Sequence, residues 1–136
     1  MIISSYSKEL DTTTLKYIPF NGQLGVLGHE LDHVSYFNNR NKFGVLRVAF
    51  GNLSKRYMDR LEYNTDQGTI DHKLGWQLLD WSVYVRDALV TVYFRKWGLP
   101  YRNIDFDALP LPDSERYMHP QTIRKKITEN PLYKNP

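Results

Sequence analysis

The fold of this chain is decided around residues 24–34, which read LGVLGHELDHV. Apolar side chains recur here at three- and four-residue spacing, as they do along one face of an α-helix: Leu24, Leu27, Leu31, Val34. Asn21 can cap the start of such a helix, and the polar run at residues 38–41 can end it. The sequence therefore predicts a helix from about residue 21 to residue 37.

Three further helices are expected. Residues 53–74 form a long polar-faced pattern that Gly75 would close, and residues 76–97 are apolar on most faces, as in the central helix of a core. A last short helix should start near Pro120 and end before Pro131. Residues 98–113 contain three prolines without a sustained period and are interpreted as an ordered surface loop.

Extended structure is expected only near the N-terminus. Residues 15–20 alternate over a short stretch, and Pro19 would confine such a strand to a sheet edge or a strand end. The predicted fold class is therefore mainly α (α+β): a helical domain with a short N-terminal edge strand or small sheet. Residues 1–136 are expected to form a single domain.

Composition excludes several classes of protein. The chain has 136 residues, a net charge of +3 and no cysteine. The absence of cysteine excludes a disulfide scaffold, a cysteine-ligated zinc finger, an iron–sulfur cluster and a cysteine nucleophile. The basic run at residues 124–126 is interpreted as a solvated helix face, so no nucleic-acid partner is expected. No segment approaches the roughly 20 apolar residues of a membrane span, and the N-terminus does not resemble a signal peptide. A cytoplasmic location is the default expectation.

The first predicted helix contains the pattern H-E-x-x-H. His29 and His33 are four residues apart, and four residues turn a helix through about 400°, so both imidazoles lie on one face and can converge on a metal ion. Glu30 lies beside that face, where its carboxylate can reach a water on the metal without being a ligand. Zinc is the expected ion, because imidazole suits it and a catalytic zinc site takes three protein ligands plus water.

A candidate third ligand lies in the long helix. Glu62 and Asp66 are four residues apart and face the same way, so one carboxylate can bind the metal while the other orients a histidine. Asp59 precedes Glu62 by three residues on the same face and is a rival ligand.

H-E-x-x-H on one helix, followed by Glu-x-x-Thr-Asp on a second, resembles the gluzincin branch of the zinc metallopeptidases, in a small or minimal, zincin-like form. The resemblance covers roughly residues 15–75. It implies that His29, His33 and Glu62 bind zinc, that Glu30 is the general base, and that Asp66 holds a ligating histidine. It also implies a peptide or protein substrate, hydrolysed by a zinc-bound water that Glu30 activates.

Two alternatives remain open at this point. The zinc site could serve structure or partner binding without catalysis, or the chain could be a helical interaction module without a metal. His72, Tyr63 and Tyr84 are the candidates for a group that stabilises the transition state, although each is more readily interpreted as an ordinary surface or core residue. The sequence does not indicate an oligomeric state.

Overall fold

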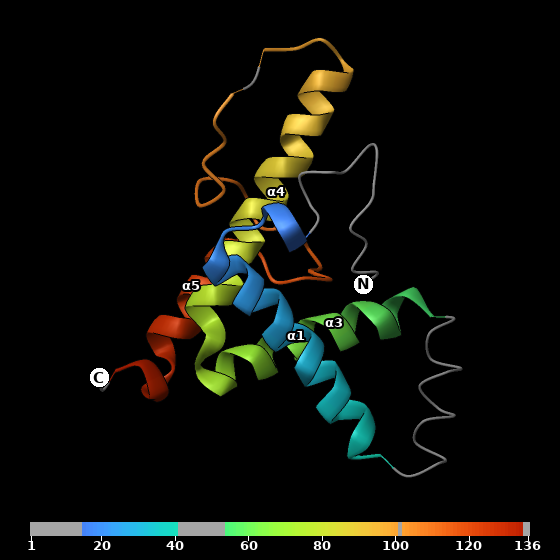
Figure 1. Cartoon of the computed structure of the whole chain (residues 1–136), viewed down its shortest axis with the longest axis vertical. Helices are drawn as coiled ribbons and strands as arrows, with labels where there is room; N and C mark the ends of the chain where they lie inside the picture. Colours follow the sequence, from blue (N-terminus) through green and yellow to red (C-terminus); the bar gives the residue numbers. More distant parts are fainter. Residues whose placement is uncertain (1–14, 41–53, 101, 135–136) are drawn as a thin grey trace.

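A computed structural model describes residues 15–40, 54–100 and 102–134, and these residues contain helices and loops but no strand (Figure 1). The elements are a 3₁₀ turn at Leu15–Tyr17, α1 at Phe20–Asn38, α3 at Lys55–Thr69, a π-helical segment η3 at Ile70–Leu74, α4 at Gly75–Lys96, α5 at Pro120–Glu129 and a 3₁₀ turn at Pro131–Tyr133. The predicted helical class is confirmed. A short apolar stretch of the sequence, residues 43–50, lies outside the described residues.

The predicted edge strand is wrong. Leu15–Tyr17 form a 3₁₀ turn, and Pro19 is the N-cap residue directly before α1, with φ −53°. This φ is the one that the proline ring imposes, and it suits entry into a helix as well as it suits an edge strand. The turn also buries Ile18, whose carbonyl accepts a hydrogen bond from the Gln23 side chain at 2.8 Å.

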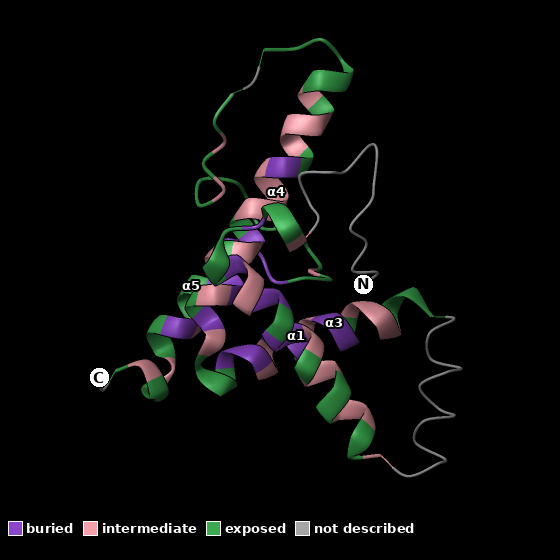
Figure 2. Ribbon diagram, in the orientation of Figure 1, coloured by how far each residue is buried: buried purple, intermediate pink, exposed green. Residues whose placement is uncertain are grey.

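Helix α1 packs against α4 through small residues and not through its leucines. Its buried positions are Gly22, Gly25, Val26, Gly28 and His29. The leucine and valine stripe that predicts the helix is largely exposed, with Leu31 at 66% and Val34 at 53% (Figure 2). The periodicity identifies the helix correctly, but it does not identify the face that is buried.

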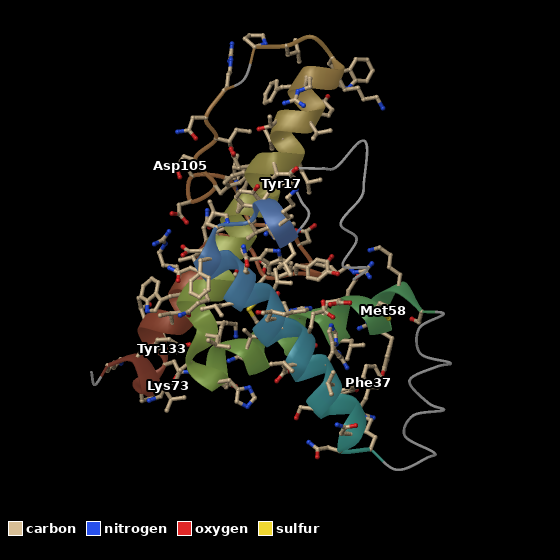
Figure 3. All side chains as sticks on the ribbon, in the orientation of Figure 1. Tyr17, Phe37, Met58, Lys73, Asp105 and Tyr133 are labelled. Carbon is tan, nitrogen blue, oxygen red and sulfur yellow. The ribbon has the colours of Figure 1, made fainter. Side chains whose placement is uncertain are left out.

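The helix expected over residues 53–74 is divided into α3 and η3. Lys73, which is labelled in Figure 3, has a φ of +66°, so the chain turns out of helical geometry there and re-enters it at Gly75. Gly75 begins α4 and does not close the preceding helix. A β-carbon at Gly75 would lie 2.7 Å from the Ile127 side chain. The backbone N–H of Gly75 donates to the Tyr133 hydroxyl at 2.8 Å, so close packing accounts for a glycine at this position.

The core lies where η3, α4 and α5 meet. It contains six buried apolar side chains: Ile70, Leu78, Leu79, Met118, Ile123, Ile127. Helix α5 is confirmed, with Pro120 in its first turn. Among the described residues, the segment between α4 and α5 contains no helix and is mostly exposed, as the expected loop would be. None of the described helices combines the length and the apolar character needed to cross a membrane.

Candidate metal centre

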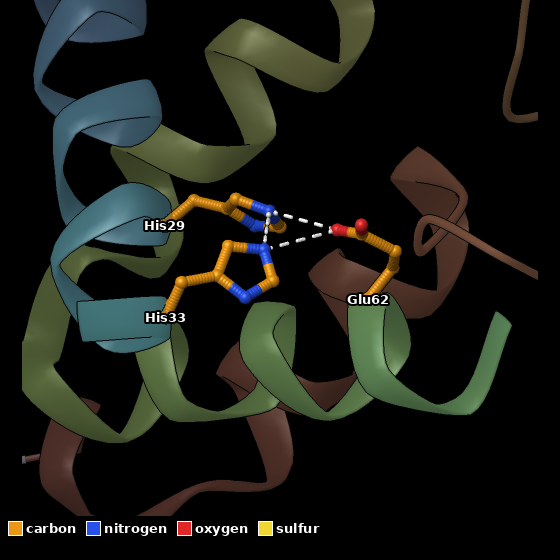
Figure 4. A group of neighbouring side chains, drawn as sticks. All are labelled: His29, His33 and Glu62. Carbon is orange, nitrogen blue, oxygen red and sulfur yellow. Dashed lines mark hydrogen bonds and ion pairs between the residues drawn. The ribbon is translucent and has the colours of Figure 1, made fainter. Parts of the chain in front are cut away.

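Three side chains from two helices converge in the interior of the molecule. His29 and His33 project from α1 and Glu62 from α3, and their tips point toward one another (Figure 4). The two Nε2 atoms are 3.1 Å apart, and each lies 3.2 Å from Glu62 Oε2. His29 and Glu62 are buried, and the His33 side chain is 17% exposed. The pairing of Glu62, and not Asp59, with the two histidines is the arrangement that the resemblance implies.

The three atoms have the spacing of one face of a coordination tetrahedron. Zinc binds imidazole nitrogen and carboxylate oxygen at about 2.0–2.2 Å, which places ligand atoms about 3.3–3.6 Å apart in a tetrahedral site. The observed separations of 3.1–3.2 Å fall slightly below this range. A shift of a few tenths of an ångström in each side chain would therefore accommodate the ion.

The remaining ring nitrogens are also held. His29 Nδ1 lies 2.8 Å from Asp66 Oδ1, and His33 Nδ1 lies 3.2 Å from Thr65 Oγ1. The Thr65 hydroxyl donates to the Leu61 carbonyl at 2.9 Å, so it accepts from His33. We therefore assign the proton of each neutral imidazole to Nδ1. This leaves both Nε2 lone pairs directed at the carboxylate, which is the arrangement of histidine ligands around a metal.

Three acceptor atoms this close together require a positive charge between them, supplied either by a metal ion or by a proton. Burial lowers the pKa of the His29 imidazole, but its hydrogen bonds to Asp66 and Glu62 outweigh burial and raise that pKa to about 9. Burial raises the pKa of Glu62, but the His29 and His33 imidazoles beside its carboxylate, which donate to it when they are protonated, lower that pKa to about 2. In the absence of a metal ion, the His29 imidazole is therefore protonated on both ring nitrogens at neutral pH, and a metal ion bound here would have to displace the proton on Nε2.

The stability of the zinc-free protein should depend on pH in a defined way. The pKa of His29 is raised, so its contribution is complete below about pH 6.5 and is lost as pH rises through 9. The pKa of Glu62 is lowered, so its contribution is complete above about pH 4.5 and is lost as pH falls through 2. We expect this pair to stabilise the fold most between pH 4.5 and 6.5, with a loss of a few kcal/mol by pH 9.

Urea unfolding across this range, with a chelator present, measures the effect. The Glu62→Gln variant is the comparison, because it removes the Glu62 carboxylate and should abolish the acid limb of the profile and reduce the alkaline limb, part of which Asp66 maintains. A zinc-free wild type whose unfolding free energy rises steadily from pH 6.5 to 9 would contradict the assignment.

Asp66 is a buried carboxylate with two partners. Its side chain is 1% exposed, its Oδ1 atom accepts from His29, and its Oδ2 atom accepts from the backbone N–H of Met118 at 2.7 Å. The sequence pattern placed Asp66 near a histidine without specifying which one, and the structure pairs it with His29. Thr65 and Met118 were not anticipated. The spacing of Thr65, three residues after Glu62 on the same helix face, is the one signal that could have indicated it.

The other candidates lie outside the cluster. Asp59 forms an ion pair with Lys55 at 3.1 Å, and the His72 side chain is 68% exposed and lies 3.4 Å from Asp32. Tyr63 packs against the core, and Tyr84 is half-buried on α4. Glu30 follows His29 on α1 and is partly exposed. None of these five residues belongs to the metal-ligand group found in the described part of the chain.

A largely apolar pocket of about 370 Å³ lies beside the cluster. Asp66 lines it together with Trp81 and Tyr117, whose rings lie 5.5 Å and 6.0 Å from the His29 ring. Further apolar walls come from α4 and α5: Leu78, Val85, Leu89, Ile123. The pocket adjoins His29 on the side of Asp66, and the three ligand atoms themselves do not line it.

The chain was compared with protein-family models, curated proteins and solved structures. None of the three comparisons finds a match. The function is therefore inferred from the side chains themselves.

Proposed function

We propose that the chain binds one zinc ion through His29, His33 and Glu62 and hydrolyses peptide or amide bonds. The observation that supports this most directly is the triangle of ligand atoms with sides of 3.1–3.2 Å. Two imidazoles and one glutamate are a donor set of catalytic zinc sites, which keep a fourth position for water or substrate. Among the described residues, the metal-ligand group has these three members and no fourth.

Zinc bound at such a site polarises a carbonyl group and lowers the pKa of water. Glu30 is the residue proposed to move the protons. It is next to His29 in α1, about 100° further round the helix, and it is partly exposed, so its carboxylate can contact solvent while His29 remains buried. Glu30 would take one proton from the attacking water and deliver it to the leaving amine as the C–O bond forms and the C–N bond breaks.

The adjoining pocket suggests which substrates are favoured. Its walls are mainly aliphatic and aromatic, and Trp81 and Tyr117 extend from it to the His29 ring. A peptide whose scissile bond lies at the metal could place an apolar side chain in this pocket, and burial of that side chain would contribute roughly 1.5–3 kcal/mol to binding.

The first test of the proposal is metal content. We expect purified wild-type protein, loaded with zinc and desalted, to retain one zinc per chain in elemental mass spectrometry. Glu62→Ala should lose the ion, because two imidazoles alone do not hold it. Asp59→Ala is the matched control: it removes a carboxylate one turn earlier on the same helix, and it should retain the zinc. A wild-type chain that binds no zinc under these conditions would refute the proposed function.

A further inference from the structure

Arg86 is a half-buried cation on α4 that binds backbone carbonyls. Its Nη1 donates to the Ser82 carbonyl at 3.2 Å and also to the Ser82 hydroxyl. Its Nη2 donates to the carbonyls of Tyr117 and Met118 at 3.4 and 3.3 Å. Within the described part of the chain, no carboxylate forms an ion pair with Arg86. The guanidinium therefore serves to hold the segment that precedes α5 against α4.

The Nη2 bond to the Tyr117 carbonyl favours one orientation of the Tyr117–Met118 peptide plane. The Tyr117 carbonyl and the Met118 N–H belong to the same trans peptide group, so they point in opposite directions. With the carbonyl held by Arg86, the N–H is directed away from α4. The next carbonyl, that of Met118, is held twice, by Arg86 and by the Ser82 hydroxyl at 3.2 Å. Rotation of the Tyr117–Met118 peptide would break the bond from Arg86 to the Tyr117 carbonyl, and the bonds to the Met118 carbonyl hold the peptide that follows it.

The Met118 N–H is the group that fixes Asp66. It donates to Asp66 Oδ2 at 2.7 Å, while Asp66 Oδ1 accepts from His29. Asp66 is too buried for solvent to replace either bond. If the peptide turned away, Oδ2 would lose its partner, and the carboxylate could rotate out of the plane that suits His29 Nδ1.

We propose that Arg86 is a positioning residue for the metal centre, acting through the Tyr117–Met118 peptide and Asp66 on His29. The proposal rests on the proposed zinc site, because it assigns Arg86 an effect on the affinity of that site. Groups that orient a ligating histidine typically change metal affinity 10- to 100-fold when they are removed. Arg86 is one step further away than Asp66, so the lower end of that range is expected.

The test measures the zinc dissociation constant of Arg86→Gln by competition with a chromogenic chelator. We expect binding to weaken about tenfold. The ¹⁵N resonances of His29 and the amide proton of Met118 should shift in the same variant, also without zinc. Arg124→Gln is the matched control: Arg124 pairs with Asp107 at 3.0 Å on the surface, and its loss should leave both readouts unchanged.

A double-mutant cycle distinguishes positioning from general destabilisation. If Arg86 acts through Asp66, Arg86→Gln should weaken zinc binding in the wild-type background and have little further effect in an Asp66→Asn background. A purely structural role would give the same fold-change in both backgrounds. Equal effects in both backgrounds would therefore overturn the proposal.

A milder variant covers the case in which Arg86→Gln does not fold. Ser82→Ala removes one of the two donors to the Met118 carbonyl and leaves Arg86 in place, so a two- to fivefold loss of zinc affinity is expected, again absent in the Asp66→Asn background.

Suppose that the wild type binds zinc, and that Ser82→Ala and any folded Arg86 variant bind it as tightly as the wild type does. The role of Arg86 is then refuted and the metal site stands. If wild type binds no zinc but the Met118 amide and His29 signals still shift in the Arg86 or Ser82 variant, the metal site fails and the coupling from Arg86 to His29 stands. If wild type binds no zinc and those signals do not move, both fail.

Discussion

Glu30→Gln is expected to lower the rate of peptide hydrolysis by about 10²- to 10⁴-fold while leaving one zinc bound per chain. Glutamine has nearly the shape of glutamate but cannot accept a proton from water at neutral pH. Glu30 is not one of the three converging ligands, so its replacement should not weaken the metal site. The measurement combines zinc content with mass-spectrometric detection of cleavage in a mixed peptide library rich in apolar residues.

A second Glu→Gln change shows whether the effect is specific. Glu129 is exposed at the end of α5 and pairs weakly with Lys125 at 4.0 Å, so Glu129→Gln should hydrolyse the library at the wild-type rate. Undiminished cleavage by Glu30→Gln would reject Glu30 as the general base. A wild-type protein that holds zinc firmly but cleaves no peptide would instead support the non-catalytic zinc domain.

The parts of the site that could be predicted are those that depend on helix geometry. Four residues of α-helix bring His29 and His33 onto one face whatever else the chain does. Likewise, Glu62 and Asp66 must share a face of α3. That these two faces meet does not follow from spacing. It was a hypothesis from the residue types, which the resemblance to gluzincins also implied, and the structure brings the side chains together across about 30 residues of sequence.

The parts that could not be predicted depend on backbone groups of a distant segment. The Met118 N–H and the carbonyls that Arg86 holds are present in every peptide unit, so no residue type marks them in the sequence. Asp66 and Met118 are 52 residues apart, and their contact depends on how the segment before α5 lies against α4. In the sequence, the one feature that could have indicated this arrangement is Arg86, a charged residue in a largely apolar helix.

The same contrast holds for the fold. Periodicity located the helices to within a few residues at most ends, because their apolar spacing is a local property. It could not show that α1 buries its glycines and exposes Leu31 and Val34, since that depends on how closely α4 approaches. The mistaken strand has a similar origin: a short alternating stretch that contains a proline, residues 15–20, is equally compatible with a 3₁₀ turn that leads into a helix.

The close approach of α1 to α4 leads to the largest expected effect on stability. A methyl group at Gly25 would lie 2.3 Å from the Gln77 carbonyl oxygen and 2.8 Å from the Leu78 nitrogen. These are backbone atoms, which no side-chain rotation can move aside, so the two helices must separate. Overpacking usually costs about 1–3 kcal/mol, and alanine regains up to about 1 kcal/mol in helix propensity. For a clash with backbone the cost lies at the top of this range, so we expect Gly25→Ala to lose about 2 kcal/mol net, which corresponds to a melting temperature lower by about 7 °C.

Gly22→Ala is the control that separates this steric effect from the substitution itself. It lies one turn earlier on the same face of α1, and its nearest neighbour is the Ile18 Cγ2 methyl at 2.6 Å, which can rotate away, whereas the Trp81 backbone is 3.5 Å distant. The gain in helix propensity should offset much of the cost there, so we expect a change within about 1 kcal/mol. Urea unfolding of both variants in chelator gives the comparison.

Gly25 is also one turn before His29, so separation of α1 from α4 should move the His29 imidazole away from Asp66. Zinc affinity should therefore fall in Gly25→Ala and not in Gly22→Ala. Equal stability of the two variants would mean that the helices do not cross at Gly25.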